Sequence, residues 1–299
     1  MESNAWTGYL APEGLEEALE EELEGIVLRQ GRLFLAKGAP QRVHWVQNYW
    51  IEPQTISFSS IAQAAEALRS LGPLWAHFPN VCVRRGELIA KRLPFFHPKP
   101  VAFSDPLPSA PLGSWTLLDE KTLLCAPRCS SPFMHGEVRL LETKEPPSRA
   151  YLKLWELFLK TRKWPKKGDL CFEVGASPGS WTWVLSQMGA HVIAVDRSSL
   201  EPFIERHPNV SFLKKDAFSL APNDFPDVKW VFSDLICYPK KLFAWIQQWL
   251  DKEVNLVCTL KFQGKEEYGI LKEFEAISGS EIIRLFHHKH ELTWVRFSK

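Results

Sequence analysis

The sequence predicts an α/β fold, with a doubly wound, mostly parallel sheet in its second half and a smaller α+β domain before it. From residue 148 onward, short apolar runs alternate with amphipathic segments, which is typical of βαβ units. Residues 281–299 hold two strand-like runs joined by a short turn, which predicts an antiparallel hairpin at the end of the sheet. We therefore expect two domains, at 1–147 and 148–299.

The first domain begins with a strand–helix–strand pattern over residues 5–38. We expect Pro12 to open the helix and Gly25 to close it. Residues 60–72 predict a second helix. Several prolines lie between Pro94 and Pro111. Because proline is disfavoured inside helices and strands, they indicate a linker or loop over 94–113.

In the second domain, Ser148 is placed to cap a helix that runs to about Lys160. The sequence then predicts five strands, at 169–175, 191–196, 210–216, 229–235 and 254–261. Helices are expected between them, at 181–189 and 239–250. No internal repeat interrupts this alternation.

Composition narrows the class of protein. The 299 residues carry 36 Lys+Arg and 35 Asp+Glu, so the formal net charge is +1. Residues 1–147 are net −3 and residues 148–299 net +4, a basic excess that permits a polyanion partner without requiring one. No apolar run approaches the roughly 18 residues of a membrane span, and no secretory signal is present. We expect a soluble, cytoplasmic protein and favour a monomer.

The six cysteines do not predict a metal site. No C-x-x-C pair occurs, and Cys125 and Cys129 lack a second pair of zinc ligands. We interpret them as reduced, mostly buried thiols.

A glycine-containing loop, "GASPGS", follows the first strand of the second domain. Ligands of open α/β sheets bind at the carboxyl ends of strands, and Gly175 and Gly179 would allow the backbone to approach one closely. Asp196 ends the second strand, where its carboxylate could bind ribose hydroxyls, and Asp216 ends the third, within reach of an adenine amine. The loop lacks the G-x-G-x-x-G of dinucleotide sites and the phosphate-binding G-x-x-x-x-G-K-[ST]. An adenosine ligand without a pyrophosphate, S-adenosylmethionine, is therefore expected.

Four charged residues should gather beside this loop. Asp234 ends the fourth strand and Lys261 the fifth, Lys153 lies on the helix before the first strand, and Glu291 begins the last strand. A hydroxyl becomes a good nucleophile when a base removes its proton. We assign that role to Lys261. The second amine, Lys153, would help to lower the pKa of Lys261, and Asp234 and Glu291 would position the two amines.

These motifs carry a resemblance to a known family. The Lys-Asp-Lys-Glu order resembles that of FtsJ-like ribose 2′-O-methyltransferases. Residues 130–299 are similar to the RlmM-type members in "SPFMHGEVRLLETKEPPSRAYLKLWELF", "VGASPGSWTWVL", "SDLICYPKKLFAWIQQWL" and "TLKF". The resemblance is faint over residues 1–129.

The resemblance implies a Rossmann-like methyltransferase fold and 2′-O-methylation of a cytidine in large-subunit ribosomal RNA before full assembly. It implies Lys261 as the proton acceptor. To the implied cofactor contacts we add Gly175 and Trp181, which gives the set Ser148, Gly175, Ser177, Pro178, Gly179, Ser180, Trp181, Asp196, Asp216 and Asp234. Two features depart from the family. Ser180 replaces a loop glycine, and a ferredoxin-like and THUMP-type RNA-docking half is shortened to 147 residues.

Other functions were weighed against this one. A non-catalytic RNA-binding protein that keeps the fold is the main alternative, whereas an oxidoreductase would show the dinucleotide glycine pattern. The basic stretches 81–94 and 160–167 are candidate phosphate contacts or solvated surface. "FHHKHE" at 286–291 is interpreted as an RNA- or solvent-facing turn rather than a metal site. The helical spacing of Trp155, Trp181, Trp183, Trp245 and Trp249 predicts core positions.

Overall fold

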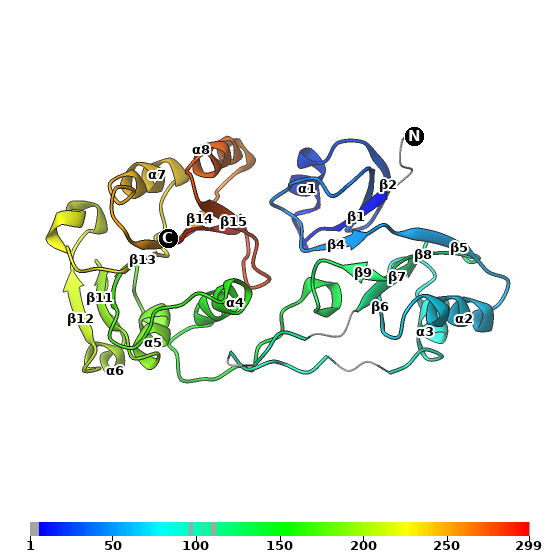
Figure 1. The fold of residues 1–299 in the computed structure, drawn as a ribbon, viewed down its shortest axis with the longest axis horizontal. Coiled ribbons are helices and arrows are strands. Elements are labelled where there is room, and N and C mark those ends of the chain that lie inside the picture. The colour runs from blue at the N-terminus through cyan, green and yellow to red at the C-terminus, as the bar shows by residue number, and fades with distance from the viewer. Residues whose placement is uncertain (1–5, 96–97, 104, 109–111, 299) are drawn as a thin grey trace. The chain divides into compact units, whose positions relative to one another are not determined.

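The computed structural model describes residues 6–95, 98–103, 105–108 and 112–298 and divides the chain into two units, Met1–Leu141 and Glu142–Lys299 (Figure 1). Each unit has its own sheets and its own buried core, and each is described separately below.

The N-terminal unit begins with a five-stranded antiparallel sheet in the order β2-β3-β1-β4-β9. Its elements are β1 (Trp6–Leu10), α1 (Glu16–Glu22), β2 (Ile26–Gln30), β3 (Leu33–Lys37), β4 (Asn48–Ile51) and β9 (Arg128–Cys129). The strand–helix–strand start agrees with the prediction, but two helix bounds were wrong. The helix begins at Glu16 instead of Pro12, because a turn containing Gly14 at φ +77° comes first, and it ends at Glu22, before Gly25.

A second sheet, in the order β5-β8-β7-β6, completes this unit. The predicted helix at 60–72 is α2, and the hydroxyl of Ser60 caps it by accepting a hydrogen bond from the amide of Gln63 at 3.2 Å. The remaining elements are β5 (Gln54–Ser57), α2 (Ile61–Leu71), β6 (Trp75–His77), α3 (Val83–Ala90), β7 (Gly113–Leu117), β8 (Thr122–Ala126) and the 3₁₀ turn η1 (Met134–Gly136). The apolar faces of α2 and α3 pack with Trp75, Trp115 and Leu123 in one core cluster.

The C-terminal unit is built on a seven-stranded sheet in the order β12-β11-β10-β13-β14-β16-β15. Five neighbouring strands are parallel, and β16 runs antiparallel to both β14 and β15. The predicted parallel sheet with a closing hairpin is confirmed. The strands are β10 (Leu170–Val174), β11 (His191–Asp196), β12 (Val210–Lys214), β13 (Trp230–Ser233), β14 (Asn255–Lys261), β15 (Ser280–Ile283) and β16 (Glu291–Arg296).

Helices cover both faces of this sheet. Figure 1 shows α4, α5 and α6 on one side and α7 and α8 on the other. The helices are α4 (Tyr151–Thr161), α5 (Ser180–Gln187), α6 (Pro202–Glu205), α7 (Pro239–Gln247) and α8 (Leu271–Glu275), with the 3₁₀ turns η2 (Ala217–Ser219), η3 (Pro222–Asp224) and η4 (Lys265–Ile270). No helix in the described part of the chain is long and apolar enough to cross a membrane.

Aromatic side chains fill much of the core between these layers. Four of the five tryptophans predicted to be core are buried, Trp181, Trp183, Trp245 and Trp249, and Trp155 is partly buried. Their apolar area stabilises the packing of the helices against the sheet. These five tryptophans are therefore structural and do not form a base-stacking surface.

One predicted cap was wrong. Helix α4 begins at Tyr151 with Ala150 as its N-cap, and the Ser148 side chain does not cap it. The Ser148 hydroxyl instead lies beside Ser180, at 2.8 Å between the two Oγ atoms, so it serves the junction between two helices.

Candidate active site

The glycine-containing loop connects β10 to α5 at the carboxyl edge of the sheet. Gly175 has φ +74° and Gly179 has φ +115°, a region that glycine adopts without the steric cost of a Cβ. A Cβ at Gly175 would lie 2.8 Å from the amide nitrogen of Leu235. The backbone of Gly175 therefore packs directly against the backbone that follows β13. This contact brings the loop next to Asp234.

The two predicted adenosine-binding carboxylates lie beside this loop. Asp196 accepts hydrogen bonds from the amides of Ser177 at 3.1 Å and Ser198 at 2.8 Å. Asp216 is exposed and accepts one from the amide of Phe218 at 2.9 Å. These bonds fix both carboxylates at neighbouring strand ends, and each carboxylate oxygen can accept a further hydrogen bond.

A cavity of about 410 Å³, which we call the donor cavity, lies between these groups. Six of the predicted cofactor residues line it: Gly175, Ser177, Pro178, Asp196, Asp216 and Asp234. Sequence reasoning missed the rest of its lining, which includes Ala150, Val195, Arg197, Lys215, Phe218, Ile236, Cys237 and Lys241. Arg197, Lys215 and Ile236 follow a strand end by one to three residues, and the others lie elsewhere on strands, helices or loops, so no single motif marks this lining.

Four predicted cofactor residues do not line the donor cavity: Ser148, Gly179, Ser180 and Trp181. Trp181 is buried, and its indole nitrogen donates to the carbonyl of Ala150 at 3.0 Å. Ser180 is also buried. Its Oγ accepts from the amide of Ser148 at 2.9 Å and donates to the carbonyl of Ser148 at 3.1 Å. The first turn of α5 thus holds the chain segment that leads into α4.

The four charged residues predicted to gather beside the loop do meet. Nζ of Lys261 lies 2.9 Å from Oδ1 of Asp234, and Nζ of Lys153 lies 3.5 Å from the same oxygen. Lys153 also pairs with Oε1 of Glu291 at 2.8 Å. Lys261 further donates to the main-chain carbonyl of Asp234 at 2.5 Å. The two amines and two carboxylates therefore form one connected chain.

Electrostatics fix the charge of Lys153. Burial lowers its pKa, but the carboxylates of Asp234 and Glu291 outweigh burial, and the net pKa is raised above the usual lysine value. Lys153 is therefore an ammonium at neutral pH, and its side chain is only 14% exposed. An ammonium held in that way is a fixed positive charge beside Lys261.

A second cavity, of about 670 Å³, lies on the other side of this charged group and is called the acceptor cavity here. Lys153, Glu291 and Lys261 line it, together with Ser148, Arg149, Ala150, Leu152, Phe286, His287 and Lys289. Ala150 and Lys261 line both cavities. Lys261 is thus placed where a molecule in one cavity would meet a molecule in the other.

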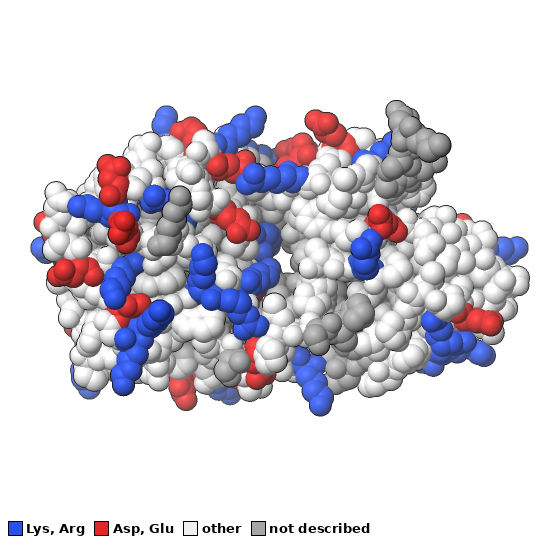
Figure 2. Space-filling view, viewed as in Figure 1, with Lys and Arg blue, Asp and Glu red and all other residues white. Residues whose placement is uncertain are grey.

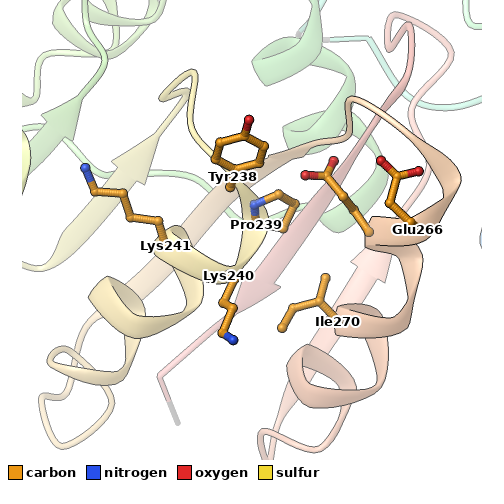
Figure 3. A pocket seen from close by; sticks show the side chains of 7 residues that line it. Tyr238, Pro239, Lys240, Lys241, Glu266 and Ile270 are labelled. Atoms are coloured by element: carbon orange, nitrogen blue, oxygen red, sulfur yellow. The ribbon is translucent and has the colours of Figure 1, made fainter.

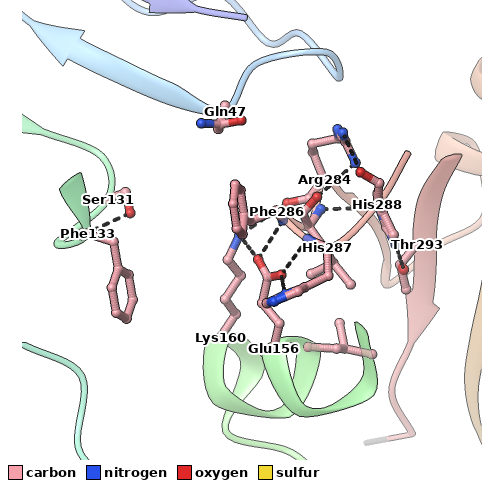
Figure 4. A network of polar contacts seen from close by, with 12 residues as sticks. Gln47, Ser131, Phe133, Glu156, Lys160, Arg284, Phe286, His287, His288 and Thr293 are labelled. Carbon is pink, nitrogen blue, oxygen red and sulfur yellow. Dashed lines mark hydrogen bonds and ion pairs between the residues drawn. The ribbon is translucent and has the colours of Figure 1, made fainter. Parts of the chain in front are cut away.

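The turn between β15 and β16 forms one wall of the acceptor cavity, and sequence reasoning missed what holds it. Glu156 on α4 is fully buried and accepts from the amides of Phe286 at 2.8 Å and His287 at 3.1 Å (Figure 4). Lys160 pairs with it at 3.1 Å. Burial raises the pKa of Glu156, but Lys160, His287 and the amide of Phe286 lower it more, to about 2. No hydropathy signal distinguishes such a glutamate from a solvated one.

The expectation that "FHHKHE" faces RNA or solvent was wrong for His288, whereas His287 lines the acceptor cavity and its side chain is 11% exposed. His287 bonds Glu156 through Nδ1 at 2.7 Å. His288 is buried and bonds Thr293 through Nε2 at 2.9 Å. Within the described residues, no group of three or more His, Cys, Asp or Glu side chains could hold a metal ion.

A buried carboxyl also lies at the end of β10, just before the glycine-containing loop, which is called the donor loop below. Glu173 on β10 is 1% exposed and accepts from the hydroxyl of Thr182 at 2.7 Å. Burial raises its pKa to about 8, with Asp234 and Asp196 adding to the rise. The sequence placed Glu173 inside a strand, but alternation alone did not mark it as a charged core position.

A further cavity, of about 590 Å³, opens beside the donor cavity between α7 and η4. Its lining is Tyr238, Pro239, Lys240, Lys241, Glu266, Glu267 and Ile270 (Figure 3). Lys241 also lines the donor cavity, and its Nζ lies 3.8 Å from the centroid of the Phe218 ring. Two lysines and two glutamates line this cavity, so the charge of its lining favours neither an anionic nor a cationic ligand.

The sequence of the C-terminal unit matches a known protein family. Residues 146–291 match the family described as FtsJ-like methyltransferase. Proteins named ribosomal RNA large subunit methyltransferase M are similar in Halorhodospira halophila (33% identical, over 40% of this chain and 35% of that protein), Laribacter hongkongensis (28%, over 56% and 52%) and Pseudomonas aeruginosa (29%, over 57% and 53%).

The chain spans about half the length, or less, of these relatives. Among solved structures, TrmN from Thermus thermophilus matches over 98% of this chain and 99% of that one, at 13% identity and a TM-score of 0.39. A likeness that distant carries no argument about function. The family match covers the donor loop, all four charged residues and every strand of the sheet except β16, of which it includes only Glu291. S-adenosylmethionine is accordingly the indicated cofactor, and the C-terminal unit belongs to the FtsJ-like methyltransferases.

Proposed function

We propose that this chain transfers a methyl group from S-adenosylmethionine to the 2′-hydroxyl of a cytidine ribose in large-subunit ribosomal RNA. The observation that carries the proposal is the position of Lys261. It lines both cavities and lies within 3 Å of the Asp234 carboxylate, which also neighbours Lys153.

The donor cavity fits the cofactor. Asp196 would accept the ribose hydroxyls, Asp216 would accept the adenine amine, and the Gly175–Ser177 backbone would pass close to the methionine part. A carboxylate at each of two adjacent strand ends suits an adenosine. When bound, S-adenosylmethionine supplies an electrophilic methyl group on a positively charged sulfur.

The acceptor side would perform the proton chemistry. In its neutral form Lys261 has a lone pair that accepts the proton of the 2′-hydroxyl while the oxygen–carbon bond forms and the sulfur–carbon bond breaks. The Lys153 ammonium would stabilise the negative charge that develops on the oxygen. Asp234 and Glu291 hold that ammonium in place, so much of the rate enhancement would come from fixed geometry.

The choice of RNA rests on the similar proteins, which are named for large-subunit ribosomal RNA. Lys and Arg side chains lie among Asp and Glu on the C-terminal unit (Figure 2), so charge alone does not mark an RNA path. We assign RNA docking to the N-terminal unit. We also propose RNA that is not yet fully assembled as the substrate, because a ribose must enter the acceptor cavity.

Labelled S-adenosylmethionine and protein-free large-subunit ribosomal RNA test the proposal. Lys261→Ala should lower transfer at least a hundredfold and leave cofactor affinity within about threefold, because the amine is needed for proton removal. Lys272→Ala, an exposed lysine on α8, is the matched control and should be unchanged. Full transfer by Lys261→Ala would refute the base assignment.

The alternative, a non-catalytic RNA-binding protein, makes a different prediction in the same assay. It predicts cofactor or RNA binding with no transfer by the wild-type protein. The intact group of Lys153, Asp234, Lys261 and Glu291 favours the enzyme.

A further inference from the structure

Several buried or partly buried hydrogen bonds hold the backbone of the turn between β15 and β16, in addition to those from Glu156. The guanidinium of Arg284 donates to the carbonyls of Leu285 at 2.8 Å and His288 at 3.1 Å. Nδ1 of His288 accepts from the amide of Leu285 at 3.2 Å. Together with the two amides held by Glu156, these bonds fix the backbone of the cavity wall.

Glu156 also fixes the tautomer of His287. A pKa of about 2 keeps Glu156 ionised, and an ionised carboxylate can only accept hydrogen bonds. Nδ1 of His287, 2.7 Å away, must therefore be the donor. In the neutral ring this leaves Nε2 with a lone pair, as an acceptor.

His287 lines the same cavity as Lys153, Lys261 and Glu291. Its side chain is 11% exposed, so a ligand there could reach it. Phe286 is partly buried and also lines the cavity, which offers an apolar surface for a base. The turn presents two polar side chains to this cavity, the exposed ammonium of Lys289 and Nε2 of His287, and the second is an acceptor whose orientation Glu156 fixes.

We propose that the acceptor cavity selects a base with an exocyclic amino group, cytosine among the pyrimidines, by a hydrogen bond to Nε2 of His287. Cytosine presents an N4 amino donor where uracil presents an O4 acceptor. Uracil would face the Nε2 lone pair with a second acceptor, which costs a buried hydrogen bond. Glu156 is the positioning residue, because it sets the tautomer. This inference rests on the proposed function and assigns its preference for cytidine to one residue.

The test compares two RNA fragments that contain the nucleotide labelled by the wild-type protein and differ only in cytidine or uridine at that position. The full chain should methylate the cytidine fragment about tenfold to a hundredfold faster. His287→Ala should lower the rate on cytidine until the two rates lie within about threefold. His287→Gln should keep part of the preference, because its amide can donate to Glu156 and accept from the base.

His191→Ala, an exposed histidine at the start of β11, is the matched control and should keep the full preference. Cofactor affinity and melting temperature show whether each variant is folded. Equal wild-type rates on the two fragments would overturn the inference, and so would a folded His287→Ala variant with an unchanged ratio. Transfer to neither fragment, nor to whole ribosomal RNA, would instead refute the proposed function.

Discussion

Ser180 shows how one residue can link the donor loop to the charged group. Its side chain is buried, at the loop position where the resemblance to the family implies a glycine. Its hydroxyl bonds both the amide and the carbonyl of Ser148. Ser148 lies three residues before Tyr151, where the helix that carries Lys153 begins. The substitution therefore adds a tether at this junction.

Ser180→Ala should lower the free energy of unfolding by about 1–3 kcal/mol, because the buried Ser180 hydroxyl makes two hydrogen bonds to the backbone of Ser148 and both are lost. Thermal or urea unfolding measures this. Ser186→Ala on the same helix is the control. Its hydroxyl donates only to the carbonyl of Trp183, so it should cost less. Equal costs for the two variants would argue against the tether.

At the residue scale, the sequence predicted which charged groups would meet, because three of them lie at strand ends of a recognisable sheet and Lys153 lies on the helix just before its first strand. Lys153, Asp234, Lys261 and Glu291 are indeed connected. It did not predict Glu156 or Glu173, whose burial depends on partners 130 and 9 residues away. It also did not distinguish Trp181 as a core residue from a cofactor contact, because both fit a position just after the loop.

Among the elements, the donor loop is the least tolerant segment of the site. Gly175 combines φ +74° with a backbone neighbour 2.8 Å from any Cβ. Two separate costs therefore act on a substitution there, one from the dihedral angle and one from the clash with Leu235.

Gly175→Ala should weaken cofactor binding at least tenfold and lower the melting temperature, since the loop or the end of β13 must move. Gly168→Ala is a matched control. Gly168 has φ +84°, with no atom within 4 Å of an added Cβ. That variant is therefore destabilised only by its backbone dihedral angle and not by a clash. Calorimetric titration with S-adenosylmethionine measures the first effect. Equal affinities for the two variants would show that the clash does not matter.

The predictability of elements differs between the two units for a physical reason. In the C-terminal unit, apolar parallel strands and amphipathic helices carry strong periodic signals, and the sheet follows from them. In the N-terminal unit, short strands such as β6 (Trp75–His77) and β9 (Arg128–Cys129) pair with residues far away in the sequence. Tertiary pairing, which local sequence does not encode, defines those strands.

For the whole molecule, Glu173 should make stability depend on pH. Its pKa is about 8 in the folded state against an ordinary value of 4.5. Folding therefore favours the protonated carboxyl. That stabilisation is complete below pH 4.5 and is lost progressively as the pH rises to about 8.

Glu173→Gln, a neutral mimic of the protonated form, should raise the melting temperature by several degrees at pH 8 and leave it nearly unchanged at pH 5. Differential scanning calorimetry at both pH values measures this. A Glu173→Gln variant less stable than the wild type at pH 8 would show that the buried carboxyl is ionised in the folded state.

The central claim is that the two cavities bring a methyl donor and a ribose hydroxyl together at Lys261. The most direct measurement is the chemical position of the transferred methyl group on ribosomal RNA, read by protection from alkaline cleavage. The account predicts one protected cytidine, present with the wild-type protein and absent with Lys261→Ala. Label that is incorporated without protection would place the methyl group on a base, and would contradict the account.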